Sequence, residues 1–147
     1  MTSLSARWAT DDERARWDEL VTANPAGGDF LQSSTVAEAK VPHGMEPKHV
    51  VFERSGETVS AALFHERRIP GLGKLWLGNR APGVQRVDEL EDHLDALRLF
   101  LRRHGRGVFL VTFEPPVVSD DETEAALLAS ASLTAPDLHR REGIQGN

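Results

Sequence analysis

The longest periodic segment of the chain, residues 88–104, constrains the fold more than any other stretch. Its apolar positions recur at intervals of three and four residues: Val87, Leu90, Leu94, Leu97 and Leu101. This spacing predicts an α-helix with one continuous apolar stripe, and Gly105 marks its end. The apolar run at residues 108–113 follows at once and predicts a strand that is buried on both faces. A helix joined this closely to a strand is expected to lay its stripe on a sheet.

The segments before this helix predict the other strands of the sheet. Residues 48–54 and 58–69 are separated by the turn sequence Ser-Gly-Glu, which indicates an antiparallel hairpin. Residues 74–79 predict a third strand of the same meander, because they follow a Pro-Gly-Leu-Gly break.

Two helices are expected near the ends of the chain. The first spans Thr10–Asn24 and begins with a capping box, in which Thr10 is the N-cap and Glu13 lies three residues further on. The last begins at Asp120 or Asp121 and continues through a run of alanine and leucine.

A shorter helix is expected within residues 28–40, Gly-Asp-Phe-Leu-Gln-Ser-Ser-Thr-Val-Ala-Glu-Ala-Lys. Phe30 and Leu31 predict a strand-like start that is anchored in the core. Ser33 or Ser34 then caps the helix, and Lys40 is its last residue. The complete order of elements predicts a three-layer α/β sandwich with a mostly antiparallel mixed sheet.

Composition bounds the class of protein. The chain has 147 residues, which indicates one domain. It has no cysteine, so disulfides and thiolate zinc sites are excluded. No apolar stretch approaches the ~20 residues of a membrane span, and the N-terminus has no signal-peptide core, so a cytoplasmic protein is expected. The net charge of −6 argues against nucleic-acid binding through a broad basic surface.

Several patterns that could carry chemistry have simpler interpretations. The sequence Arg102–Gly107 matches R-x-x-G-x-G, which in acetyltransferases of the GNAT type binds a coenzyme pyrophosphate. Here it closes a helix instead of opening one, so the helix dipole has the wrong sign for an anion. The histidines form no H-x-x-x-H pair, so no metal is expected. His65 and Glu66 are expected at a surface or edge position of their strand.

Lys40 and Arg80 are the candidate binding residues. Each lies where a regular element gives way to a loop rich in glycine and proline. Loops over a rigid sheet are where binding residues collect. No G-x-S-x-G sequence and no convincing general base is present, so catalytic residues are not assigned.

With its segments in this order, the chain resembles the Fem family (FemABX-like) of peptidoglycan-bridge aminoacyltransferases, which includes lipid II:glycine glycyltransferases. Residues 17–40 resemble the opening of the family, where a tryptophan and a Pro/Gly loop precede F-L-Q-S and a short helix with a terminal lysine. Residues 44–84 resemble its strand–hairpin–strand region with an R-G-P-like loop. Residues 93–117 resemble its helix and strand with a D/E-P-P type ending.

The resemblance implies a GNAT-like first subdomain over residues 8–136, followed by an unpatterned tail over residues 137–147. Members of the family transfer an amino acid from aminoacyl-tRNA to the stem peptide of a peptidoglycan precursor, which is lipid II or its nucleotide-linked form. No cofactor is implied. By motif position, Lys40 and Arg80 are similar to cations that hold the diphosphate of the precursor.

The chain also departs from the family. Members are much longer, and position 35, usually aromatic, is a threonine. The resemblance therefore implies a half that requires a second subdomain or subunit. Two alternatives stay open: a truncated, non-catalytic module that binds the precursor, and a single-domain GNAT acyltransferase that uses acyl-coenzyme A. His65, Glu66 and Glu114 are the titratable candidates for a catalytic role.

Overall fold

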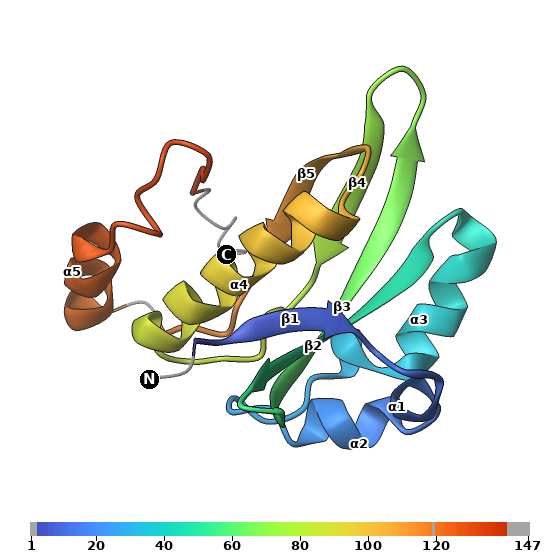
Figure 1. Cartoon of the computed structure of the whole chain (residues 1–147), viewed down its shortest axis with the longest axis horizontal. Coiled ribbons are helices and arrows are strands. Elements are labelled where there is room, and N and C mark those ends of the chain that lie inside the picture. The colour runs from blue at the N-terminus through green and yellow to red at the C-terminus, as the bar shows by residue number, and fades with distance from the viewer. Residues whose placement is uncertain (1–2, 119, 141–147) are drawn as a thin grey trace, which may run out of the picture.

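The computed structural model describes residues 3–118 and 120–140 as a five-stranded sheet with helices on both faces (Figure 1). The strands are β1 (Ser5–Trp8), β2 (Glu46–Arg54), β3 (Glu57–Ile69), β4 (Gly73–Gly78) and β5 (Val108–Phe113). The helices are α1 (Asp11–Ala15), α2 (Trp17–Thr22), α3 (Ser34–Lys40), α4 (Val87–His104) and α5 (Asp121–Ala129), with 3₁₀ turns η1 (Phe30–Gln32) and η2 (Val41–His43). Strand order follows chain order, and only β4 and β5 are parallel.

Strand β3 shows how the three layers arise. Its side chains alternate between the two faces of the sheet. Ala62 and Phe64 pack in the cluster that α4 covers, whereas Ala61 and Leu63 pack in a second cluster with Trp17 of α2. Helices therefore cover both faces of β3, and the predicted three-layer sandwich of GNAT-like type is confirmed.

Strands β3 and β4 pair over only part of β3, from His65 to Ile69. On the β3 residues that come before this pairing, two amide side chains replace the missing strand. Asn24 donates to the Ala61 carbonyl at 2.9 Å and accepts from its N–H at 2.8 Å. Gln32 does the same for Leu63, at 3.0 and 2.7 Å. The backbone N–H and carbonyl groups of Ala61 and Leu63, which have no β4 partner, are thus hydrogen-bonded to side chains of the same protein.

The elements with strong local signals are confirmed. Residues 55 and 56 turn the β2–β3 hairpin with positive φ angles of 53° and 79°. Thr10 and Glu13 form the predicted capping box of α1. Ser33 caps α3 through the Val36 N–H, and Asp120 caps α5.

Other expectations at the N-terminal end were wrong. The helix predicted over Thr10–Asn24 is broken at Arg16, which has φ −117° and separates α1 from α2. Strand β1 was not predicted. Phe30 and Leu31 belong to a 3₁₀ turn instead of a strand-like start, and they are 69% and 40% exposed, so they do not anchor the segment in the core.

Strand β5 was expected to be buried on both faces, and this was also wrong. It lies at the edge of the described sheet, and Phe109 and Leu110 are 46% and 48% exposed. A continuous apolar run is typical of a central strand but does not require one. The segment after α5 returns to α4, where Asp137 pairs with Arg98 at 2.9 Å. The last part of the expected tail, residues 141–147, lies outside the described residues.

Candidate functional site

A polar cavity of about 200 Å³ lies where the parallel strands β4 and β5 end. Its walls come from the loop before η1, the loop after β4 and Pro116 beyond β5. The amides Asn24 and Gln32, which bind the backbone of β3, also line it. The carboxyl ends of parallel strands are a common place for ligands in α/β folds, so this cavity is a candidate binding site.

Arg80 lies at this cavity. Its Nε donates to Asp29 Oδ2 at 3.1 Å, and nearly half of its side chain is exposed. Its backbone adopts φ 58°, a conformation that is uncommon outside glycine. Asp29 also accepts from the Leu31 N–H at 2.9 Å, so one carboxylate caps η1 and holds the arginine. Sequence reasoning missed Asp29; its place just before a helical turn was the available signal.

Lys40 lies at the other end of the same segment, as the last residue of α3. It is half-buried and forms no ion pair with any residue between 3–118 and 120–140. A cation at the C-terminus of a helix is stabilised by the helix dipole.

His65 lies near enough to Lys40 to feel its charge, and His49 lies on the same face of the sheet as His65. His65 is completely buried, so its expected surface position was wrong: β3 is the central strand and is covered there. Both of its ring nitrogens lack a hydrogen-bond partner within the described part of the chain. Burial, with a smaller contribution from the charge of Lys40, lowers the pKa of His65 to about 4. Burial likewise lowers the pKa of His49 to about 4, with Arg14 as the second cause. Both rings are therefore neutral at neutral pH.

The structure does not bring Lys40 and Arg80 together. Arg80 contacts Asp29, before η1, whereas Lys40 follows the whole of α3. Seven helical residues alone span about 10 Å. A ligand that touched both cations would have to be extended.

The titratable candidates do not form a catalytic pair. Glu66 points to the opposite face from His65, as strand alternation requires. It is buried, contrary to the expected edge position, and its carboxylate has partners there: Trp76 Nε1 donates to it at 2.7 Å, and two lysines lie 3.9 Å away. Glu114 is exposed beyond β5, and its N–H donates to the Gly78 carbonyl at 3.0 Å.

The R-x-x-G-x-G sequence has the structural role that its position predicts. The Gly105 N–H donates to the Leu101 carbonyl at 2.7 Å and ends α4. The Gly107 carbonyl accepts from the Lys74 N–H at 2.7 Å and starts the pairing of β5 with β4. These glycines therefore serve a helix end and a strand start, and none opens a helix toward a phosphate.

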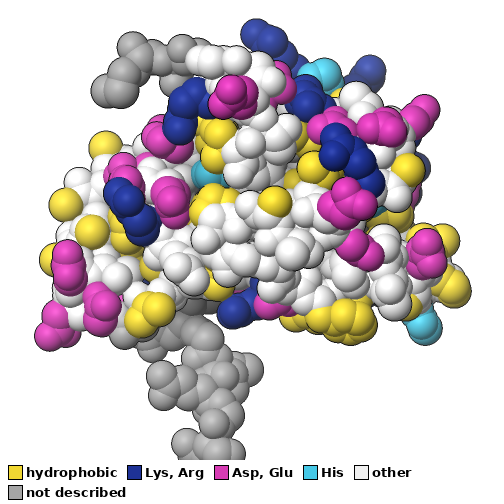
Figure 2. Space-filling model, turned by 90° about the horizontal axis from the view of Figure 1, so that it is seen from below, with side chains coloured by type: hydrophobic (Ala, Val, Ile, Leu, Met, Phe, Trp, Pro, Cys, Tyr) yellow, Lys and Arg dark blue, Asp and Glu magenta, His cyan; other side chains and the backbone are white. Residues whose placement is uncertain are grey.

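On the face in Figure 2, acidic and basic side chains are interspersed. Among the described residues, no group of three potential ligands could hold a metal ion. None of the helices in the described ranges has both the length and the apolar character needed to cross a bilayer.

Comparison with known proteins finds similarity among solved structures. No protein-family model and no curated protein matches the chain. Among solved structures, the chain is similar to the crystal structure of FemX, with a TM-score of 0.59 and 20% sequence identity. The match covers 84% of this chain and 30% of the FemX chain. At this identity the match shows a FemX-like fold and no more. The chain spans less than a third of the length of the FemX chain.

Proposed function

We propose that this chain binds the diphosphate of a peptidoglycan precursor and acts in the aminoacyl transfer that builds the interpeptide bridge. The observation that carries the proposal is Lys40. It is a half-buried cation without an ion-pair partner among the described residues, held at the end of a capped helix near the neutral ring of His65. The FemX-like fold supports the same assignment.

The chemistry of a diphosphate fits the position of Lys40 at the end of α3. A phosphate needs cations or N–H donors, and a lysine meets it as a compact point charge. Because Lys40 has no carboxylate partner in the described chain, binding would not first have to break an ion pair. Arg80 would be a weaker contact, since Asp29 already occupies its Nε.

The direct test is a calorimetric titration of the purified chain with a nucleotide-linked muropeptide. We expect saturable binding that inorganic pyrophosphate competes away. The matching muropeptide without its diphosphate is the control ligand, and it should bind much more weakly. Equal affinity for the two muropeptides would contradict the proposal.

The transfer step needs a separate assay, because His65 and Glu66 point to opposite faces of the sheet. The chain would be incubated with charged tRNA and the precursor, and transfer of the labelled amino acid measured. Binding without transfer would identify the chain as a non-catalytic precursor-binding module. Both substrates are cytoplasmic, so the proposed place of action is the cytoplasm.

An acyl-coenzyme A-dependent acyltransferase is the other function to test. The R-x-x-G-x-G sequence closes α4 and so lacks the helix N-terminus that would hold a pyrophosphate. Titration with coenzyme A should therefore give no saturable binding. Tight binding of coenzyme A would favour the acyltransferase instead.

A further inference from the structure

The β3–β4 hairpin extends beyond the rest of the sheet (Figure 1) and ends in an exposed leucine. Its turn is closed by the Leu72 N–H, which donates to the Ile69 carbonyl at 3.1 Å. Pro70 and Gly71 are the two central residues, and Gly71 has the positive φ of 79° that a type II turn needs there. Leu72 is 66% exposed. A turn with restricted backbone freedom therefore holds a large apolar side chain in the solvent.

Basic side chains gather at the same end of the molecule, on two segments. They are Arg67, Arg68 and Lys74 on the hairpin, and Arg103 and Arg106 at the end of α4 and just after it. The two segments meet where the Lys74 N–H donates to the Gly107 carbonyl at 2.7 Å. No acidic residue occurs in residues 67–87 or 96–113. Together with Leu72, these cations form what we call the basic tip.

The protein does not neutralise the basic tip. Its arginines have no ion-pair partner within the described ranges. Glu66 lies 3.9 Å from Lys74, but this carboxylate is buried and lies equally close to Lys48. The whole chain has a net charge of −6, so the basic tip is a local exception on an acidic protein. Clustered cations of this kind favour an anionic partner.

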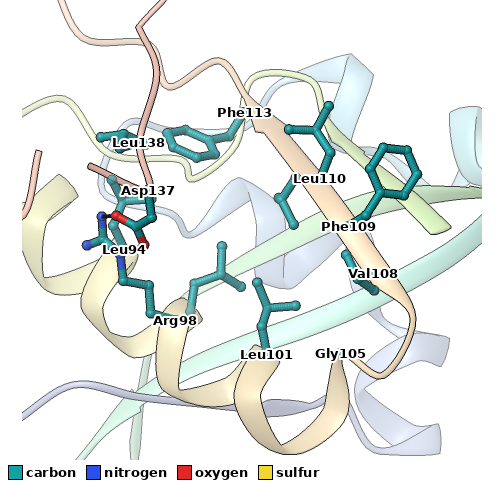
Figure 3. A pocket seen from close by; sticks show the side chains of 12 residues that line it. Leu94, Arg98, Leu101, Gly105, Val108, Phe109, Leu110, Phe113, Asp137 and Leu138 are labelled. Carbon is teal, nitrogen blue, oxygen red and sulfur yellow. Dashed lines mark hydrogen bonds and ion pairs between the residues drawn. The ribbon is translucent and has the colours of Figure 1, made fainter. Parts of the chain in front are cut away.

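We infer that the basic tip binds the surface of an anionic lipid membrane. Leu72 enters the boundary between head groups and acyl chains, where an apolar side chain gains free energy, while the cations meet the negative head groups. Phe109, 46% exposed next to Gly73 and near the end of α4, is a second apolar side chain at this end (Figure 3). An RNA would contact the same cations, but it offers a protruding leucine no apolar layer to enter. Lys40 lies on another element, so membrane binding does not depend on the proposed diphosphate contact.

Vesicle sedimentation of the full chain tests the charges of the basic tip. We expect binding to vesicles of equal parts phosphatidylglycerol and phosphatidylcholine, and none to phosphatidylcholine alone. Arg68→Gln should weaken that binding roughly fivefold, because each cation near an anionic membrane contributes about that factor. Arg54 lies opposite Glu57, at the other end of β3, and Arg54→Gln is the control that should bind like the unmodified chain. No binding to the anionic vesicles, or equal binding by the two variants, would overturn the inference.

A fluorescent label tests whether the turn enters the bilayer. Because the chain has no cysteine, Leu72→Cys can be labelled with a fluorophore whose emission moves to shorter wavelength in an apolar environment. We expect that change when the anionic vesicles are added. Leu128→Cys, on α5 and 75% exposed in the unmodified chain, is the matched control and should show none. The same change at both positions, or at neither, would contradict membrane entry by the basic tip.

Leu72→Ser separates a membrane from an RNA as the partner. It should weaken vesicle binding roughly tenfold, because no large apolar side chain then enters the bilayer, whereas Leu128→Ser should not weaken it. Equal effects of the two serine variants would count against the inference. Binding to transfer RNA without binding to vesicles, unchanged in Leu72→Ser, would identify an RNA surface and overturn it.

Discussion

At the scale of single residues, Gln32 explains why glutamine stands in the Phe-Leu-Gln-Ser sequence. Its amide binds both backbone groups of Leu63 and donates to the Asn79 carbonyl at 2.6 Å. Trp17 Nε1 in turn donates to the Gln32 carbonyl at 2.9 Å. The residue therefore joins α2, β3 and the end of β4. A ligand role for it is not needed to explain its burial.

Replacing Gln32 should be costly. Gln32→Leu leaves the Leu63 N–H and carbonyl buried without partners, and each such group costs about 1–3 kcal/mol. We expect the free energy of unfolding to fall by about 3 kcal/mol in urea denaturation. Gln85→Ala, at an exposed position on the wall of the same cavity, should change it by less than about 0.5 kcal/mol. Equal effects of the two variants would contradict this role of Gln32.

His65, which is buried, and His49, which is half-buried, make the stability of the fold depend on pH. Their pKa is about 4 in the folded chain and about 6.5 when unfolded. As pH falls from about 6.5 to 4, the unfolded state binds protons that His49 and His65 in the folded state do not. Stability should therefore fall across that window and change little above it. Thermal melting at a series of pH values measures the loss.

A variant separates His65 from other titrating groups. His65→Leu removes a buried ring that has no hydrogen-bond partner in the described structure. It should be nearly neutral at pH 7 and should flatten the pH dependence. His43→Gln, at an exposed position, is the control and should leave the profile unchanged. If His65→Leu kept the full pH dependence, another group would be responsible.

At the scale of elements, predictions succeeded where the signal was local. The stripe of α4, the capping serine of α3 and the glycine turn of the β2–β3 hairpin depend on neighbouring residues, and all were confirmed. Predictions failed where distant segments decide. The exposure of β5 depends on what lies beside it in the sheet, and the burial of His65 depends on α3 covering β3. The bonds of Gln32 join residues 31 positions apart.

The same holds for the candidate site. Lys40 and Arg80 were predicted from the sequence as binding residues, and that prediction is untested. Asp29 was not predicted, because its pairing with Arg80 spans 51 positions. That pairing is what distinguishes the two cations: one is held by a carboxylate and the other is not. Their proposed contact with a diphosphate stays a prediction.

The cap of α3 gives a prediction at this scale. Ser33→Ala removes the acceptor of the Val36 N–H, which lies 3.3 Å from the hydroxyl. We expect a loss of about 1 kcal/mol in the free energy of unfolding, together with weaker ligand binding, because Lys40 depends on this helix. Thr35 is exposed and lies two residues after Ser33, and Thr35→Ala should change neither the free energy of unfolding nor ligand binding. Chemical denaturation and titration together would show whether the two losses coincide.

At the scale of the whole molecule, Lys40 at the end of α3 and strand β5 at the edge of the described sheet lie on different elements. The α3 corner carries a cation without a described partner, and the β5 edge carries a strand without a described neighbour. The chain spans 30% of the FemX chain that it resembles.

Titration of a Lys40→Ala variant with the nucleotide-linked muropeptide tests the proposed function most directly. Loss of a charged hydrogen-bonding group costs about 1.5–3 kcal/mol, which is roughly a ten- to hundredfold change in affinity. Arg16→Ala, a cation of the same helical layer, should bind like the unmodified chain. We predict that affinity falls at least tenfold for Lys40→Ala alone. Unchanged affinity in that variant would contradict the proposed role of Lys40.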